Sequence, residues 1–144
     1  MGAGIGVTVD SLDTATRVLV VGGMSVLSFG LLLGIPMAAA RSKAPQPPRY
    51  LFAAHLAAII QGGLLLALTV ALGISTLSTA TETLAVSILL AGVALFDLGL
   101  ATNWLQGVQD AFGEKSVGNK ISAVGTPLVL IGTGILFYGV VAAL

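Results

Sequence analysis

The chain has no cysteine and very few charged residues. Its 144 residues include six acids, six bases and one histidine, so only 8% are charged. Without cysteine there can be no disulfide, no thiolate metal site, no covalent c-type haem attachment and no cysteine nucleophile. The net charge is zero and the bases form no run, so the composition predicts no nucleic-acid partner.

The scarcity of charge also argues against a soluble globular domain. Soluble domains usually carry about a quarter charged residues, whereas 56% of this chain is hydrophobic. A membrane-spanning helix needs about 20 mainly apolar residues, and four segments qualify: 15–40, 48–74, 82–106 and 121–144. The first has no basic residue before it and is too long for a signal-peptide core. We therefore predict one all-α domain, residues 1–144, folded as an integral membrane bundle of four transmembrane helices.

The connecting segments predict the orientation in the membrane. Five of the six Lys and Arg residues lie in the loops 41–49 and 110–120, against Arg17 alone on the other side. The positive-inside rule then places both basic loops in the cytoplasm and both termini outside, in a bacterial-type inner membrane. The Ser/Thr-rich segment between the second and third helices offers Thr79 or Thr81 as the N-cap of the third.

Few polar side chains occur at membrane depth. The second helix carries His55 and Gln61, and the third carries Asp97, Asn103 and Gln106. An ionisable group near the bilayer centre costs about 3 kcal/mol on insertion scales, so it usually faces the bundle or a cavity. At 3.6 residues per turn, Gln61 lies about 120° around the axis from His55, so the two are expected to meet different neighbours.

Three roles are open for His55 from the residues alone. The imidazole could form a hydrogen bond between helices, relay protons, or bind a metal or haem. A non-haem site would need several ligands, and only Asp97 is a plausible second one. A haem needs a single histidine from the protein. The neighbouring side chains are small and leave room for a flat macrocycle: Ala53, Ala54, Ala57 and Ala58.

The polar and aromatic residues of the third helix also have structural alternatives. Asp97 could be a protonated or paired acid that joins helices. Asn103 and Gln106 share a face with the spacing typical of interhelical hydrogen bonds. Trp104 could be a packing or interfacial aromatic, or the wall of a substrate site.

Two segments together resemble a known family. "PPRYLFAAHLAAIIQGG" resembles the second helix of the hydroxylaminobenzene mutases, with Pro-Arg, an apolar spacer, Ala-His-Leu, and an amide and a glycine six and seven residues after the histidine. "LGLATNWLQG" resembles their third-helix pattern of glycine, small residues and Asn-Trp. The layout is also similar to styrene oxide isomerase. The amide here is glutamine where the family usually has asparagine, and the third helix lacks the tyrosine of the isomerase branch. The matching positions are Pro48, Arg49, Ala54, His55, Leu56, Gln61, Gly62, Gly99, Asn103 and Trp104.

The resemblance implies a small membrane isomerase that forms a homotrimer, with haem b near a subunit interface. It implies His55 as the iron ligand, with Ala58 and Gly62 of the same helical stripe beside the cofactor. Gln61, Asp97 and Asn103 are then the expected catalytic residues. Asp97 or a backbone carbonyl is expected to hold the second nitrogen of His55, and Trp104 and Asn103 are expected to contact a small aromatic substrate.

Two reactions and one non-enzymatic role follow as alternatives. Ferric haem acting as a Lewis acid would assist rearrangement of a hydroxylaminoarene to an aminophenol, or of an aryl epoxide to an aldehyde. The alternative from another class is a membrane subunit without enzymatic activity, in which His55, Asp97 and Asn103 join helices.

Overall fold

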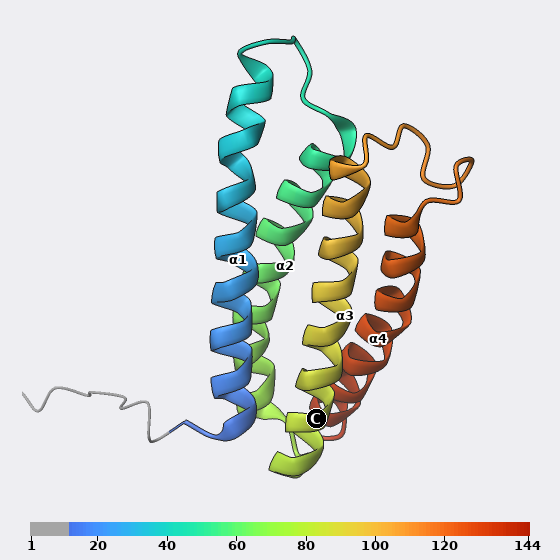
Figure 1. Cartoon of the computed structure of the whole chain (residues 1–144). Helices are drawn as coiled ribbons and strands as arrows, with labels where there is room; N and C mark the ends of the chain where they lie inside the picture. Colours follow the sequence, from blue (N-terminus) through green and yellow to red (C-terminus); the bar gives the residue numbers. More distant parts are fainter. Residues whose placement is uncertain (1–11) are drawn as a thin grey trace, which may run out of the picture.

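A computed structural model describes residues 12–144 and contains four α-helices in this range. They are α1 (Thr14–Arg41), α2 (Arg49–Ile74), α3 (Thr79–Leu105) and α4 (Val117–Val141). The chain runs up and down, so neighbouring helices are antiparallel (Figure 1). All four helices are long and apolar enough to cross a membrane. The predicted all-α, four-helix membrane fold is confirmed, with α4 starting at Val117 rather than at Ile121.

Side chains cap three of the four helices. Asp13 accepts the backbone N–H of Thr16 at the start of α1, and Ser116 does the same for Asn119 at the start of α4. The cap of α3 is Ser78, so the prediction of Thr79 or Thr81 was wrong by one residue or more. The N-cap of α2 is Pro48, which has no side-chain acceptor, so the first turn of this helix has no side-chain cap.

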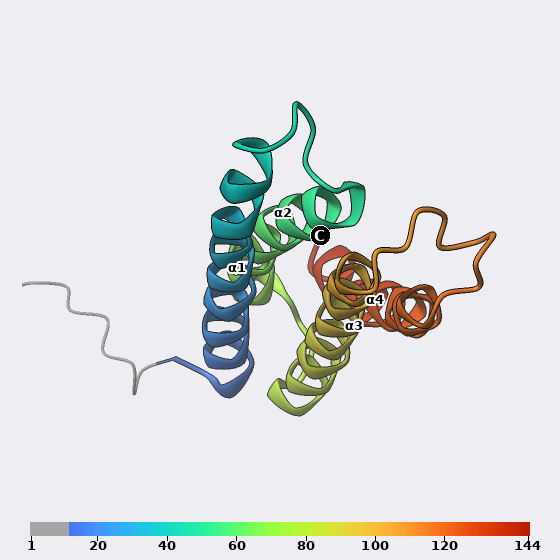
Figure 2. The same cartoon turned by 45° about the horizontal axis from the view of Figure 1, so that its top comes forward.

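The helices pack as two close pairs, α1 with α2 and α3 with α4 (Figure 2). Glycines make this approach possible. A Cβ atom added to Gly30 of α1 would lie 2.9 Å from the backbone nitrogen of Ile59 in α2. A Cβ atom added to Gly92 of α3 would lie 2.6 Å from the backbone nitrogen of Val129 in α4. Small residues are the usual means of close packing between membrane helices, where lipid removes the hydrophobic driving force.

Two apolar clusters lie between the pairs. The larger has Leu19, Leu65, Val86, Leu89 and Leu136 among its buried members. The smaller lies in the half of the bundle nearer the two basic loops. It consists of buried Leu33, Leu51 and Ala54 with Phe29, Met37, Leu100 and Trp104 packed against them.

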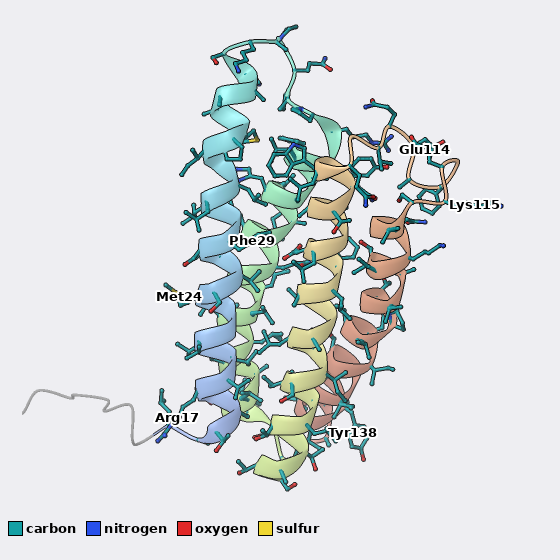
Figure 3. The ribbon with its side chains drawn as sticks, in the orientation of Figure 1. Arg17, Met24, Phe29, Glu114, Lys115 and Tyr138 are labelled. Carbon is teal, nitrogen blue, oxygen red and sulfur yellow. The ribbon has the colours of Figure 1, made fainter. Side chains whose placement is uncertain are left out.

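Both basic loops lie at the same end of the bundle (Figure 1). Figure 3 shows Glu114 and Lys115 at this end and Arg17 at the other. The Glu114 carboxylate accepts the N–H groups of Gln109 and Asp110 at 2.9 Å each. These bonds hold the pKa of Glu114 below its usual value and fold the loop onto itself.

Candidate functional site

His55 lies in the second turn of α2 and faces α1. Its Nδ1 is 2.7 Å from the carbonyl oxygen of Gly30. A carbonyl only accepts hydrogen bonds, so Nδ1 is the donor, and the lone pair of the neutral imidazole is on Nε2. Gly30 and Gly34 have no side chain to cover this carbonyl, and a Cβ atom at Gly34 would lie 3.4 Å from Cε1 of His55. The glycines of α1 therefore create the space and the acceptor that fix the ring.

The second nitrogen of His55 remains available. Nε2 forms no hydrogen bond with another residue of the described part, 12–144, and it is not among the buried side-chain atoms that lack a partner. Its lone pair is thus open to the surroundings of the bundle. A histidine that donates from one nitrogen to a carbonyl and keeps the other free has the arrangement usual for metal-ligating histidines.

Ala58 and Gly62, predicted to lie beside a cofactor, contact α1 instead. Ala58 is fully buried. A Cβ atom at Gly62 would lie 2.6 Å from the backbone nitrogen of Leu27. In the single chain these two positions belong to the contact between α1 and α2, so no open space for a macrocycle exists there. A group bound to Nε2 has to extend away from this contact.

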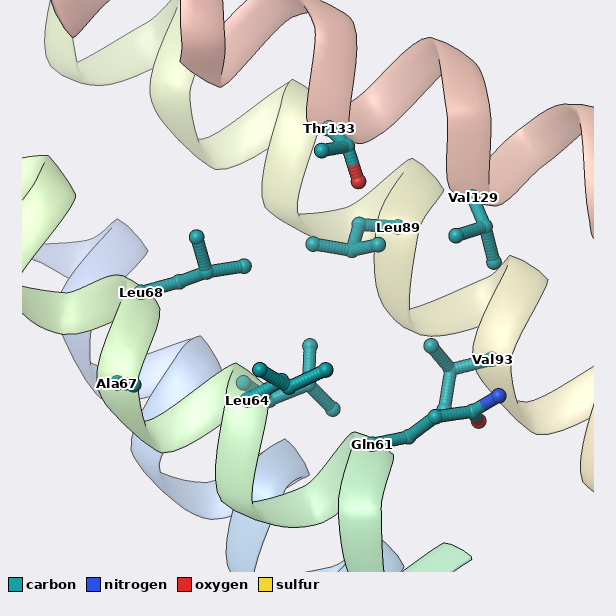
Figure 4. Close-up of a pocket in the computed structure, with 9 residues that line it drawn as sticks. Gln61, Leu64, Ala67, Leu68, Leu89, Val93, Val129 and Thr133 are labelled. Carbon is teal, nitrogen blue, oxygen red and sulfur yellow. The ribbon is translucent and has the colours of Figure 1, made fainter. Parts of the chain in front are cut away.

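Gln61 lies on a different face of α2 and lines a cavity of about 330 Å³ between α2, α3 and α4 (Figure 4). The carbonyl oxygen of its side chain, Oε1, is buried and has no hydrogen-bond partner among residues 12–144. Apart from Gln61, only Thr133 of α4 brings a polar side chain to the wall; the other lining residues are Leu64, Leu65, Ala67, Leu68, Leu89, Val93 and Val129. The cavity therefore suits a small apolar molecule with one or two polar atoms.

Asp97 of α3 faces α1 and not α2. The residue is only 2% exposed, and both carboxyl oxygens are buried with no hydrogen-bond partner in the part of the chain that the structure describes. A second cavity of about 220 Å³ lies beside it, lined also by Ser25, Val26, Phe29, Ala94 and Leu98. Asp97 therefore does not hold His55: the carbonyl of Gly30 does so.

Asn103 joins α3 to the start of α4. Its Oδ1 accepts the hydroxyl of Ser116 at 2.7 Å, and that hydroxyl oxygen in turn accepts the N–H of Asn119 at 3.1 Å. Gly118 lies directly against the same amide, where a Cβ atom would collide with it. Asn103 is only 2% exposed. Its burial and its bond to Ser116 indicate a structural role, in which it holds together the two ends of the loop between α3 and α4.

Trp104 packs against the smaller apolar cluster, whose buried residues are Leu33 of α1 and Leu51 and Ala54 of α2. Ala54 of this cluster precedes His55 in the chain, so the cluster borders the helical turn that carries His55. The four polar site residues lie in four different places. His55 lies between α2 and α1, and Gln61 lies between α2 and the pair α3–α4. Asp97 lies between α3 and α1, and Asn103 lies between α3 and the start of α4. A single chain does not bring them to one ligand.

Three features of the site were not predicted from the sequence. Gly30 and Gly34 form a Gly-x-x-x-Gly pair, which indicates close packing but does not say that the exposed carbonyl accepts from a histidine. No sequence pattern indicates that Thr133 lines a cavity, because threonines in apolar helices usually bond to the backbone of their own helix. Tyr50 uses its hydroxyl to accept the N–H of Ala111 at 2.9 Å, which joins the loop between α3 and α4 to α2.

The described residues contain no group of three or more histidine, cysteine, aspartate or glutamate side chains able to hold a metal ion. Comparison with known proteins gives no relatives: no protein-family description, curated protein or solved structure matches the chain.

Proposed function

We propose that the protein is a membrane-embedded isomerase of small aromatic molecules that uses haem b held by His55. The observation that carries the proposal is the state of the imidazole: Nδ1 donates to Gly30 and Nε2 keeps an open lone pair. The resemblance to hydroxylaminobenzene mutases supports the reaction class. Rearrangement of a hydroxylaminoarene to an aminophenol is the first candidate, and conversion of an aryl epoxide to an aldehyde is the second.

The donor set fits a haem better than a free metal ion. The described residues place no cluster of several ligands around His55, and a haem needs only one ligand from the protein. The hydrogen bond from Nδ1 to a carbonyl fixes the ring and makes Nε2 a stronger donor. Held by His55, ferric haem would supply a Lewis acid for the N–O or C–O bond of the substrate.

The other residues of the chain contribute binding and orientation. The apolar wall of the Gln61 cavity excludes water and accepts an aromatic ring, and the unpartnered amide of Gln61 can bind the polar atom beside it. Asp97 remains a candidate catalytic acid with no hydrogen bond to give up. Asn103 enters the proposal as a structural residue, since Ser116 already occupies its acceptor oxygen.

Oligomerisation is part of the proposal. His55 and Gln61 lie on different faces of α2, so a site that uses both needs a second copy of the chain. The homotrimer implied by the resemblance, with the haem near a subunit interface, meets this requirement. The inner membrane, with the two basic loops on the cytoplasmic side, is the proposed location.

The absorption spectrum of the purified protein tests the haem. Protein expressed with adequate haem supply and purified in detergent should be coloured, with a Soret band that is lost in His55→Ala. Thr69→Ala is the matched control, because Thr69 lies on the same helix and bonds only to the carbonyl of Leu66 in that helix. A folded, colourless wild-type protein after haem reconstitution would rule out the proposal.

Product analysis separates the two reactions. Incubation with phenylhydroxylamine should yield an aminophenol, and incubation with styrene oxide should yield phenylacetaldehyde if the second reaction applies. A specific observation also supports the non-enzymatic alternative: both His55 and Asn103 make hydrogen bonds between helices or to a neighbouring loop. Turnover of neither substrate by haem-loaded protein would favour this alternative.

A further inference from the structure

The end of the bundle that carries the loop between α1 and α2 has another cavity, whose lining differs chemically from that of the Gln61 and Asp97 cavities. It measures about 480 Å³ and is lined by Arg41, Gln46, Pro47, Arg49 and Phe52. We call these five residues the basic notch. Arg41 ends α1 and Arg49 begins α2, so the two guanidinium groups stand on neighbouring helix ends.

No acid of the same hairpin neutralises the basic notch. The sequence contains no aspartate or glutamate between Asp13 and Glu82. Asp13 caps the start of α1 and Glu82 lies in the first turn of α3, so both are at the opposite end of these helices. The acids at the same end, Asp110 and Glu114, accept backbone N–H groups of their own loop. Arg17 donates to the carbonyl of Leu12, whereas the side chains of Arg41 and Arg49 have no such bond within residues 12–144.

Two further features favour an anion at this place. The first turn of α2 has no side-chain cap and no acid, so its free N–H groups and the positive end of the helix dipole add to the field of Arg49. Lys43, exposed in the same loop, adds a third positive charge. Pro47 and Pro48 restrict the backbone that separates the two arginines.

The lower part of the notch is apolar. Phe52 lies one turn below Arg49 and is 48% exposed, and Leu56, one turn further along α2, continues the exposed apolar surface toward the membrane interior. A phosphate bound by the arginines would therefore have hydrocarbon directly beneath it. This combination of charge above and apolar surface below is that of a membrane phospholipid and not of a soluble phosphate.

We propose that the basic notch binds the phosphate headgroup of an anionic phospholipid, with Arg41 and Arg49 as the contacting residues. The acyl chains would run along Phe52 and Leu56. This site is independent of His55, and its test does not require haem.

The test uses the full chain in dodecyl maltoside, titrated with dioleoyl-phosphatidylglycerol, with dioleoyl-phosphatidylcholine and with sodium phosphate. Native mass spectrometry counts the retained lipid, and thermal denaturation measures stabilisation. We expect phosphatidylglycerol to be retained and to raise Tm by several degrees, and the other two to have little effect. The double variant Arg41→Gln/Arg49→Gln should bind phosphatidylglycerol at least tenfold more weakly.

The matched control is Lys115→Gln/Lys120→Gln, which removes the same charge from the loop before α4 and from the first turn of α4. This variant should bind phosphatidylglycerol like the wild type. If the control binds phosphatidylglycerol as weakly as the arginine variant, the effect is one of overall charge, and the proposed site is wrong. Unchanged binding by the arginine variant would also overturn it. Equal stabilisation by sodium phosphate would show that the notch takes a soluble anion and not a lipid. If the double variant does not fold, the single variant Arg41→Gln tests the proposal, and its affinity for phosphatidylglycerol should fall severalfold.

Discussion

The contacts within the helix pairs follow one rule for buried polar groups, and the space between the pairs follows another. Within α1–α2 and α3–α4, glycines bring backbones together, and the polar groups there have partners: His55 bonds to Gly30, Asn103 to Ser116, and Ser122 to the carbonyl of Phe96. Between the pairs, cavities border Gln61 and Asp97, whose buried oxygens have no partner among the described residues.

This difference distinguishes the contacts that stabilise the fold from the space in which a ligand could bind. Buried polar groups are hydrogen-bonded in the great majority of cases, and each exception calls for an explanation. Packing and hydrogen bonds account for the contacts within the pairs, except for Nε2 of His55, which has no partner within residues 12–144. The unpartnered oxygens of Gln61 and Asp97 reduce stability, so the space between the pairs is where a ligand would find unused hydrogen-bonding groups.

The largest effect is expected for a methyl group at Gly99, in the contact between α3 and α4. Its Cβ atom would lie 2.5 Å from the carbonyl oxygen of Gly118 and would overlap the hydroxyl of Ser122. A backbone carbonyl can give way only if the helices separate, so Gly99→Ala should lower the free energy of unfolding by about 3 kcal/mol, the upper end of the cost of overpacking. Thermal denaturation in detergent, followed by circular dichroism, measures this loss.

The control for this variant is Gly134→Ala on α4. A Cβ atom there has no heavy atom within 4 Å, so the change should be neutral or slightly stabilising, as expected for alanine in a helix. Similar losses at Gly99 and Gly134 would contradict the distinction between packed and open glycines.

A medium effect is expected for Asn103, at the junction of α3 and α4. Asn103→Ala removes the acceptor of the Ser116 hydroxyl in a buried place, which should cost about 1–2 kcal/mol. Gln106→Ala, one turn later and exposed, should change Tm little. An unchanged Tm for Asn103→Ala would contradict the structural role and favour the catalytic role predicted from the family pattern.

Hydropathy and loop composition were sufficient to predict the helices, because about 20 apolar residues between polar loops have few alternatives in a membrane protein. The cap of α3 was predicted one residue or more too late, since Ser78, Thr79 and Thr81 are all good caps and only the backbone conformation selects one of them. The start of α4 was placed at Ile121 because hydropathy does not register the polar first turn that follows Ser116.

The site was less predictable than the fold. Helical spacing separated His55 from Gln61 correctly by face, since spacing depends only on helix geometry. It could not tell which helix covers each face. Ala58 and Gly62 look like room for a cofactor in the sequence, but small residues serve close packing equally well, and α1 fills that space. The acceptor for His55 is a backbone carbonyl, which no side-chain pattern reveals.

The smallest effect on stability is expected for Gln61, in the space between the pairs. Gln61→Leu replaces a buried amide whose oxygen has no partner by an apolar group of similar size, so stability should be unchanged or rise by up to about 1 kcal/mol. If Gln61 serves a ligand, aniline should raise the Tm of the wild type and not that of Gln61→Leu. Thr69→Ala, below the cavity on α2, should respond like the wild type. A loss of stability in Gln61→Leu comparable to that of Asn103→Ala would mean that Gln61 has a structural partner, and the space between the pairs would then follow the same rule as the contacts within them.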